Sequence, residues 1–215
     1  CLEGSKQTEV LSVKDIPACH GGRAVHNIEN ALAAAALTHS LGISCADIAK
    51  GLRHFGSNTS DNPGRCDLMN RHGVQFLLDF GHNPHGLRAI LKMARGLFDD
   101  APSGGRLCIT LGQAGDRSDD DLRALAEVVH FTHPHRVMLR EVPGYERGRP
   151  PREVPSFLEK CLVEHGHDPA MLSIHVNEVD AMQAALQWAK PGDFIVHLVH
   201  MDRKPVRALL ESWQG

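Results

Sequence analysis

The stretch Leu77-Leu78-Asp79-Phe80-Gly81-His82-Asn83-Pro84-His85-Gly86-Leu87 indicates how this chain is expected to fold. An apolar run leads into one carboxylate and one imidazole, and Pro84 then suits the first turn of a helix. In open α/β sheets, ligands bind outside the carboxyl ends of the strands. We therefore expect Asp79 and His82 to face a ligand, although Asp79 could instead only cap the helix that begins near Pro84.

Short apolar segments alternate with amphipathic ones in the rest of the chain after Cys66. The expected strands are Val74–Asp79, Arg106–Leu111, Val137–Leu139, Leu172–Val176 and Phe194–Val199. One expected helix ends at Phe98, and four others span Asp119–Val129, Arg152–His165, Glu178–Ala189 and Pro205–Trp213. Short strands between helices of this length predict an α/β fold, with a mostly parallel, Rossmann-like sheet that carries helices on both faces.

A helical region precedes this pattern. An Ala-rich helix is expected over Val25–Leu41, and Ser44 followed three residues later by Asp47 predicts the capped start of a second helix. The segment Gly56–Gly64 is rich in Ser, Asn, Asp and Pro, which is typical of a linker. We therefore place a domain boundary between residues 64 and 65.

Composition excludes several classes of protein. The 215 residues are 42% hydrophobic, enough for a real core, and a net charge of −3 argues against nucleic-acid binding as the main task. The six cysteines form no CxxC pair, which indicates a reducing cytosol. Fifteen histidines occur without HExxH, so we expect no transition-metal site. No apolar run reaches about 18 residues, so we expect no membrane helix.

Five further motifs lie around the opening stretch. They are His26-Asn27-Ile28-Glu29-Asn30 before an Ala run, Asn62-Pro63-Gly64-Arg65, Gly112-Gln113-Ala114-Gly115-Asp116-Arg117, Arg140-Glu141 and Arg147-Gly148-Arg149. In this order and spacing the motifs resemble the Mur ligase family, from about Val13 to about Val199. The resemblance implies that residues 1–64 end a central ATP-binding domain and that residues 65–215 form a Rossmann-like carboxyl-terminal domain. The implied activity is that of an ATP-dependent, ADP-forming amide ligase.

Several of these residues have chemistry that suits a nucleotide. Asn27 and Asn30 lie three apart on one helical face, and amides can pair with both edges of adenine, although Asn27 could also be an N-cap. Arg65 follows a Pro-Gly turn, where its planar fork suits phosphate, although a lone surface arginine is ordinarily a solvated charge. The resemblance implies that both asparagines contact adenine, that Arg65 binds the nucleotide, that Asp79 accepts from the ribose hydroxyls and that His82 lies by the phosphates.

A second group is expected on the substrate side. The resemblance assigns Asp116 and Arg117 to the place where the incoming amino acid docks. Arg117, Arg140 and Arg149 follow strand ends or lie in the loop beyond one, so their guanidiniums could converge on a carboxylate. The alternatives are solvated surface arginines and, for the acids after Arg117, a favourable position in the first turn of a helix.

One motif of nucleotide-hydrolysing enzymes does not occur in the 215 residues. No GxxxxGK[ST] phosphate loop is present. The resemblance places that loop and the Mg²⁺ ligands in an earlier part of the central domain, and the chain opens on Cys1, so we expect a piece of a longer protein. Its expected ligands are ATP, Mg²⁺ and an amino acid, and its expected partner is the remainder of the parent chain. A ligase for folates or peptidoglycan precursors, or a non-catalytic Rossmann-like binding module, remains an alternative.

Overall fold

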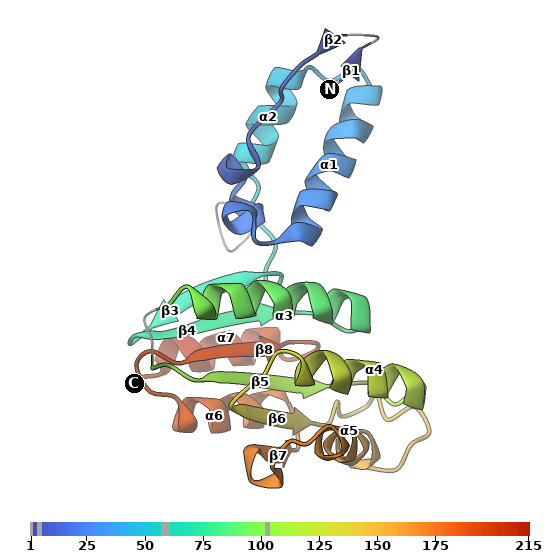
Figure 1. The fold of residues 1–215 in the computed structure, drawn as a ribbon, viewed down its shortest axis with the longest axis vertical. Helices are drawn as coiled ribbons and strands as arrows, with labels where there is room; N and C mark the ends of the chain where they lie inside the picture. The colour runs from blue at the N-terminus through green and yellow to red at the C-terminus, as the bar shows by residue number, and fades with distance from the viewer. Residues whose placement is uncertain (1, 4–5, 57–60, 102–103) are drawn as a thin grey trace. The chain divides into compact units, whose positions relative to one another are not determined.

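The computed structural model describes residues 2–3, 6–56, 61–101 and 104–215. The chain divides into two compact units, Cys1–Pro63 and Gly64–Gly215, which Figure 1 shows. Residues 57–60 of the predicted linker lie outside the described part. In that described part, no helix is both long and apolar enough to cross a bilayer.

The first unit is built on two helices, α1 (Val25–Ser40) and α2 (Cys45–His54). They follow a short antiparallel pair, β1 (Leu2–Glu3) with β2 (Lys6–Gln7), and the 3₁₀ segments η1 (Val13–Asp15) and η2 (Pro17–Gly22). The hydroxyl of Ser44 accepts a hydrogen bond from the backbone N–H of Asp47, which confirms the predicted cap of α2.

The second unit contains a six-stranded sheet in the order β3-β4-β8-β5-β6-β7. Its strands are β3 (Asp67–Arg71), β4 (Val74–Asp79), β5 (Leu107–Gly112), β6 (Arg136–Arg140), β7 (Leu172–His175) and β8 (Phe194–Leu198). Only β3 runs antiparallel to its neighbour, so the prediction of a mostly parallel sheet is confirmed. The β3 strand itself was not predicted, because its sequence mixes polar and apolar residues without a clear strand pattern.

Helices cover both faces of this sheet (Figure 1). They are α3 (Pro84–Asp99), α4 (Asp119–His130), α5 (Glu153–Glu164), α6 (Glu178–Trp188) and α7 (Arg203–Ser212), with a 3₁₀ turn η3 (Pro169–Met171) before β7. On one face, Met182 of α6 and Leu210 of α7 pack against alternate strand residues such as Phe76. The intervening residues, among them Leu77 and Val196, face the other side, where α3, α4 and α5 lie next to one another.

The position of β8 determines which loops meet. It lies between β4 and β5, with Leu77 of β4 opposite Val196 and Thr110 of β5 opposite His197. The carboxyl ends of these three parallel strands therefore lie side by side at one edge of the sheet. The segments that follow them, at Phe80, Gln113 and Val199, are brought together, and such an edge is the usual ligand site of an open α/β sheet.

Candidate functional site

Five side chains, which we call the carboxyl rim, gather at this edge: Arg65, Phe80, His82, Arg117 and His200. The Arg65 guanidinium lies over the Phe80 ring, 4.6 Å from its centre. The Phe80 ring centre is in turn 4.8 Å from that of His82 and 5.2 Å from that of His200. Arg117 is close enough for its charge to act on both imidazoles. The rim therefore combines two guanidiniums, two imidazoles and one aromatic ring.

The electrostatics of the rim favour an anionic ligand. Burial, and then the charges of Arg117 and Arg65, lower the pKa of His82, while Asp79 acts in the opposite direction. At neutral pH the imidazole is therefore mostly uncharged, and the two arginines carry the positive charge. A planar guanidinium donates two parallel hydrogen bonds to phosphate or carboxylate, so the rim can bind such a group and use His82 as a further donor.

Asp79 has a different environment from the one expected. Its side chain is only 4% exposed, and each carboxylate oxygen accepts a backbone N–H: Oδ2 from Cys66 and Oδ1 from Gly81, both at 2.8 Å. The expectation that Asp79 faces a ligand is therefore not met in this structure. The capping alternative is wrong as well, because Asn83 caps α3 by accepting from Gly86. Asp79 instead fixes the turns before β3 and after β4.

The Pro63-Gly64-Arg65 turn requires its glycine. Gly64 has a φ of +69°, and a Cβ there would lie 2.6 Å from Nε of Arg203. A side chain at this position would therefore be strained and would also displace the Arg203 side chain. The turn leaves Arg65 exposed to solvent beside Phe80, where a ligand can reach it.

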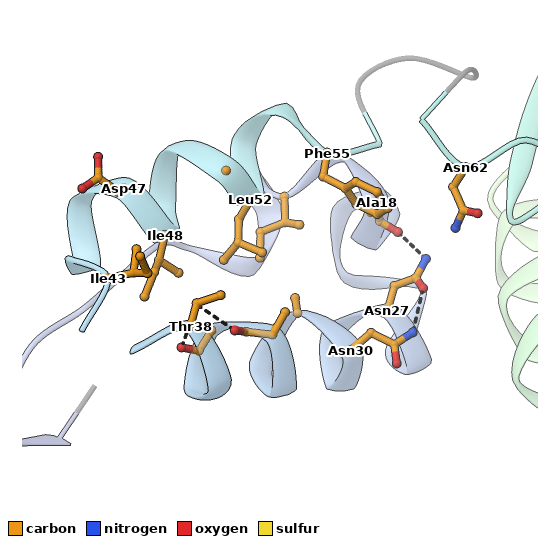
Figure 2. Close-up of a pocket in the computed structure, with 15 residues that line it drawn as sticks. Ala18, Asn27, Asn30, Thr38, Ile43, Asp47, Ile48, Leu52, Phe55 and Asn62 are labelled. Carbon is orange, nitrogen blue, oxygen red and sulfur yellow. Dashed lines mark hydrogen bonds between the residues drawn. The ribbon is translucent and has the colours of Figure 1, made fainter. Parts of the chain in front are cut away.

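Asn27 and Asn30 belong to the first unit and line a cavity of about 510 Å³ there. Figure 2 shows them side by side on α1, across the cavity from Phe55. The amide of Asn27 donates to the carbonyl of Ala18 at 2.7 Å, and Asn30 donates to Oδ1 of Asn27 at 3.4 Å. The N-cap of α1 is Ala24, so capping by Asn27 is wrong. The remaining lining is mostly apolar, which suits a flat aromatic group.

Arg149 organises the loop that carries Asp116 and Arg117. It donates to the carbonyls of Gly115 at 3.0 Å and Arg117 at 2.8 Å, and it forms 2.8 Å ion pairs with Asp119 and Glu153. These contacts occupy its guanidinium, so the structure does not present Arg149 to a substrate. Asp116 is exposed at the same loop, next to the partly exposed Arg117.

Arg140 is buried, contrary to its expected role on the substrate side. Its side chain is 0% exposed, pairs with Glu178 at 3.0 Å and donates to the carbonyl of Leu198 at 2.5 Å. Burial lowers its pKa to about 10, while Glu178 acts to raise it. A Cβ at Gly112 would lie 2.6 Å from Arg140 Nη1, so glycine makes room for the guanidinium. Arg140 therefore does not converge with Arg117 on a ligand in this structure.

Two residues of this region were missed by the sequence reasoning. Glu178 accepts the backbone N–H groups of His200, Met201 and Asp202, and His200 joins the rim. Burial and the charge of Arg140 lower the pKa of His200 to about 3. The rule that functional groups follow strand ends would have found His200 directly after Val199, whereas no local signal marks Glu178.

No group of three or more His, Cys, Asp or Glu side chains in the described part of the chain is placed to hold a metal ion.

Comparison with known proteins places this geometry in context. Residues 64–198 match the family described as Mur ligase, glutamate ligase domain. Cyanophycin synthetase of Crocosphaera subtropica is 29% identical over 195 residues, which cover 91% of this chain and 21% of that protein. UDP-N-acetylmuramate–L-alanine ligase of Rhizobium johnstonii is 33% identical over 193 residues, which cover 88% of this chain and 38% of that protein. The chain thus spans about a fifth of the first relative and under two fifths of the second.

Solved structures of low sequence identity share the fold. MurF from Acinetobacter baumannii superposes with a TM-score of 0.59 at 19% identity, over 87% of this chain and 38% of that one. FolC of E. coli in complex with ADP gives a TM-score of 0.56 at 19% identity, over 85% of this chain and 38% of that one.

Proposed function

The chain belongs to the Mur ligase family, and from this premise we propose that it is part of an ATP-dependent, ADP-forming amide ligase similar to cyanophycin synthetase. In this proposal, a carboxylate oxygen attacks the terminal phosphorus of ATP and ADP leaves. The amine of an amino acid then attacks the acyl carbon of the resulting acyl phosphate. The tetrahedral intermediate expels phosphate and leaves an amide. Both steps depend on positioning and on stabilisation of negative charge.

The observation that carries this proposal is the convergence of Arg65 and Arg117 on His82. Both guanidiniums act on the same imidazole, from the turn before β3 and from the loop after β5. Two positive charges beside a neutral donor match the charge and the hydrogen-bonding needs of a phosphoryl group. We assign Arg65 and His82 to the nucleotide, and Arg117 with Asp116 to the amino-acid side of the reacting centre.

Asn27 and Asn30 are proposed to contact adenine. Their cavity offers amide groups on one wall and apolar side chains such as Phe55 and Leu52 on the other (Figure 2). Adenine needs both kinds of contact, because its edge carries donors and acceptors while its faces are apolar. The hydrogen bond from Asn27 to the carbonyl of Ala18 would be kept, and Asn30, which is exposed, would supply the edge contact.

The first unit is proposed to be the end of a larger central domain, which would also supply the phosphate loop and the Mg²⁺ ligands. Helix α1 has no buried residue within the described part of the chain, and Leu32 and Leu37 are each 64% exposed. Apolar residues on two turns of one helix are usually covered in the native protein. The parent protein is proposed to act in the cytosol, which the free thiols of Cys19, Cys108 and Cys161 support.

Binding of ADP to the 215-residue chain tests the rim. We expect the NMR signals of Arg65 and His82 to shift on titration with ADP, and Arg65→Ala to weaken binding about tenfold, the loss of one charge-assisted hydrogen bond. Arg117→Ala, on the amino-acid side, should change ADP binding little. Arg123→Ala removes a surface arginine that pairs with Glu164 on α5 and should leave binding unchanged. Equal ADP affinity of Arg65→Ala and Arg123→Ala, or shifts confined to other residues, would show that the rim is not the nucleotide site.

A further inference from the structure

A continuous set of contacts joins the buried Arg140–Glu178 pair to the carboxyl rim. It starts at the loop after β8. Glu178 Oε1 accepts the N–H of His200 at 2.6 Å, and Oε2 accepts that of Asp202 at 2.6 Å. Arg140 donates to the carbonyl of Leu198 on the other side of Val199. The backbone around His200 is therefore held from both directions by two buried, oppositely charged groups.

The His200 side chain lies between this pair and Phe80. Its Nδ1 is 3.4 Å from Nη2 of Arg140, and a guanidinium can only donate, so Nδ1 accepts and the ring proton is on Nε2. The ring meets Phe80 edge to face at 73°. Burial and the Arg140 charge keep this imidazole neutral at physiological pH, since they lower its pKa to about 3.

Phe80 then contacts both functional groups of the nucleotide side. One of its neighbours is the Arg65 guanidinium, in a cation–π arrangement, and another is the His82 ring at 55°. Within the described part of the chain neither Arg65 nor His82 forms an ion pair, and the Phe80 ring is a contact that they share. A displacement of Phe80 would therefore change the position of both groups.

We propose that His200 is a positioning residue that holds Phe80 and, through Phe80, sets the places of Arg65 and His82 at the rim. The buried Arg140–Glu178 ion pair acts with it, because the pair fixes the loop that carries His200. This inference deepens the proposed function and depends on it for the identity of the ligand. The contacts themselves do not depend on which anion the rim binds.

The pKa of His82, followed by NMR in the 215-residue chain without ligand, tests the positioning. Arg65→Ala calibrates the measurement and should raise the pKa of His82, because Arg65 lowers it. His200→Ala should also raise the pKa of His82, because Phe80 and Arg65 would move away from it. His200→Gln should restore the wild-type pKa of His82, since the Gln amide oxygen can accept from Arg140 in place of Nδ1. His165→Ala removes an exposed histidine at the opposite edge of the sheet and should change nothing.

Phe80→Leu provides a second route that leaves His200 intact. It removes the ring but keeps an apolar side chain, and it should raise the pKa of His82 as His200→Ala does. Should both substitutions leave the pKa of His82 at its wild-type value, His200 does not position the rim. The positioning role is also overturned if Arg65→Ala leaves the pKa of His82 unchanged, because the contacts would then not couple Arg65 to His82.

Ligand binding separates this inference from the proposed function. With ADP as the probe, we expect His200→Ala to weaken binding about tenfold and His200→Gln to restore it. If the wild-type chain binds no ADP while the pKa changes occur as expected, the ligand assignment fails and the positioning role stands. If ADP binds equally well to wild type and His200→Ala, the positioning role is overturned and the proposed function stands.

Discussion

Arg140 and Glu178 form an ion pair 3.0 Å long whose two side chains are 0% and 2% exposed. The pair joins the end of β6 to the start of α6, and it also anchors the loop after β8 through Leu198 and His200. Buried charges of this kind are tolerated only when each has its partners. The pair therefore holds the end of β6, the start of α6 and the loop after β8 together at the carboxyl edge of the sheet.

Removing one member of the pair is expected to destabilise the fold. Arg140→Ala leaves the Glu178 carboxylate without its counter-ion, and the free energy of unfolding should fall by about 3–5 kcal/mol, as measured by urea denaturation. Arg136→Ala is the matched control, because Arg136 donates only to the carbonyl of Ala170 near the surface, and it should cost less than about 1 kcal/mol. Equal stability of Arg140→Ala and wild type would restore Arg140 as a candidate substrate ligand.

Asp79 is also expected to contribute to stability. Asp79→Ala would leave the N–H groups of Cys66 and Gly81 without their acceptor, at a cost of about 1–3 kcal/mol for each that stays buried. Asp79→Asn keeps one good acceptor and should lose roughly half as much. Thermal and urea denaturation of the two variants measure the difference. A normal stability of Asp79→Ala together with loss of ADP binding would instead support the ribose role.

The order of the elements followed from the sequence because apolar strands and amphipathic helices have different periods. Apolar runs predict the strands Val74–Asp79 and Phe194–Val199, and the spacing of Ser44 to Asp47 predicts a cap. The antiparallel strand β3 was not predicted, because its sequence mixes polar and apolar residues, although it pairs with β4 across a tight turn between Arg71 and Val74. Its buried Asp67 forms a 2.8 Å pair with Arg207 of α7, 140 residues away, a long-range contact that no local pattern marks.

The candidate site could be predicted only in part for the same reason. Arg65 was assigned from its Pro-Gly turn and the resemblance to the family, whereas the strand-end rule placed His82 and Arg117 at one edge. It could not distinguish side chains that reach solvent from those that turn inward, so Arg140 and Arg149 were assigned to a substrate although both are engaged within the protein. Which way an arginine turns depends on where its carboxylate lies, and Glu178 is 38 residues further along the chain than Arg140.

Lysine is not expected to replace Arg149 in holding the loop that carries Arg117. It uses separate donors for Gly115, Arg117, Asp119 and Glu153, and an ammonium group cannot reach four acceptors spread around a planar fork. Arg149→Lys should increase hydrogen exchange of the backbone amides around Arg117. Arg147→Lys, two residues earlier, should not, because that arginine stacks on Tyr145 instead. Unchanged exchange in both variants would mean that the loop does not depend on Arg149.

Stability is expected to fall as the pH falls from about 6.5. Burial lowers the pKa of His197 well below its ordinary value and that of His200 to about 3, with Arg140 adding to both effects. Below about pH 6.5 the two histidines bind protons in the unfolded chain but not in the folded chain. The free energy of unfolding therefore falls on acidification, by up to about 1.4 kcal/mol per pH unit for each histidine.

His197→Asn tests this pH dependence. The Asn side chain can replace Nδ1 of His197, which lies 2.8 Å from the Thr110 hydroxyl, but it does not titrate. Urea denaturation at pH 7, 6 and 5 should therefore show a smaller loss of stability in the variant than in wild type. Parallel losses in the two proteins would mean that His197 takes up its proton without unfolding.

The last prediction concerns activity. The 215 residues contain no GxxxxGK[ST] loop, so this chain alone should release no phosphate from ATP even where ADP binds at the rim. A phosphate-release assay of the purified chain with ATP, Mg²⁺ and a mixture of amino acids measures this, with a no-protein blank as the control. In the full-length parent protein, Arg117→Ala should raise the amino-acid KM with little change in the ATP KM, and Arg65→Ala should do the reverse. Phosphate release by the 215-residue chain that EDTA suppresses would contradict the proposal that another part of the parent protein supplies the phosphate loop and the Mg²⁺ ligands, because the chain would then itself hold the metal and the triphosphate.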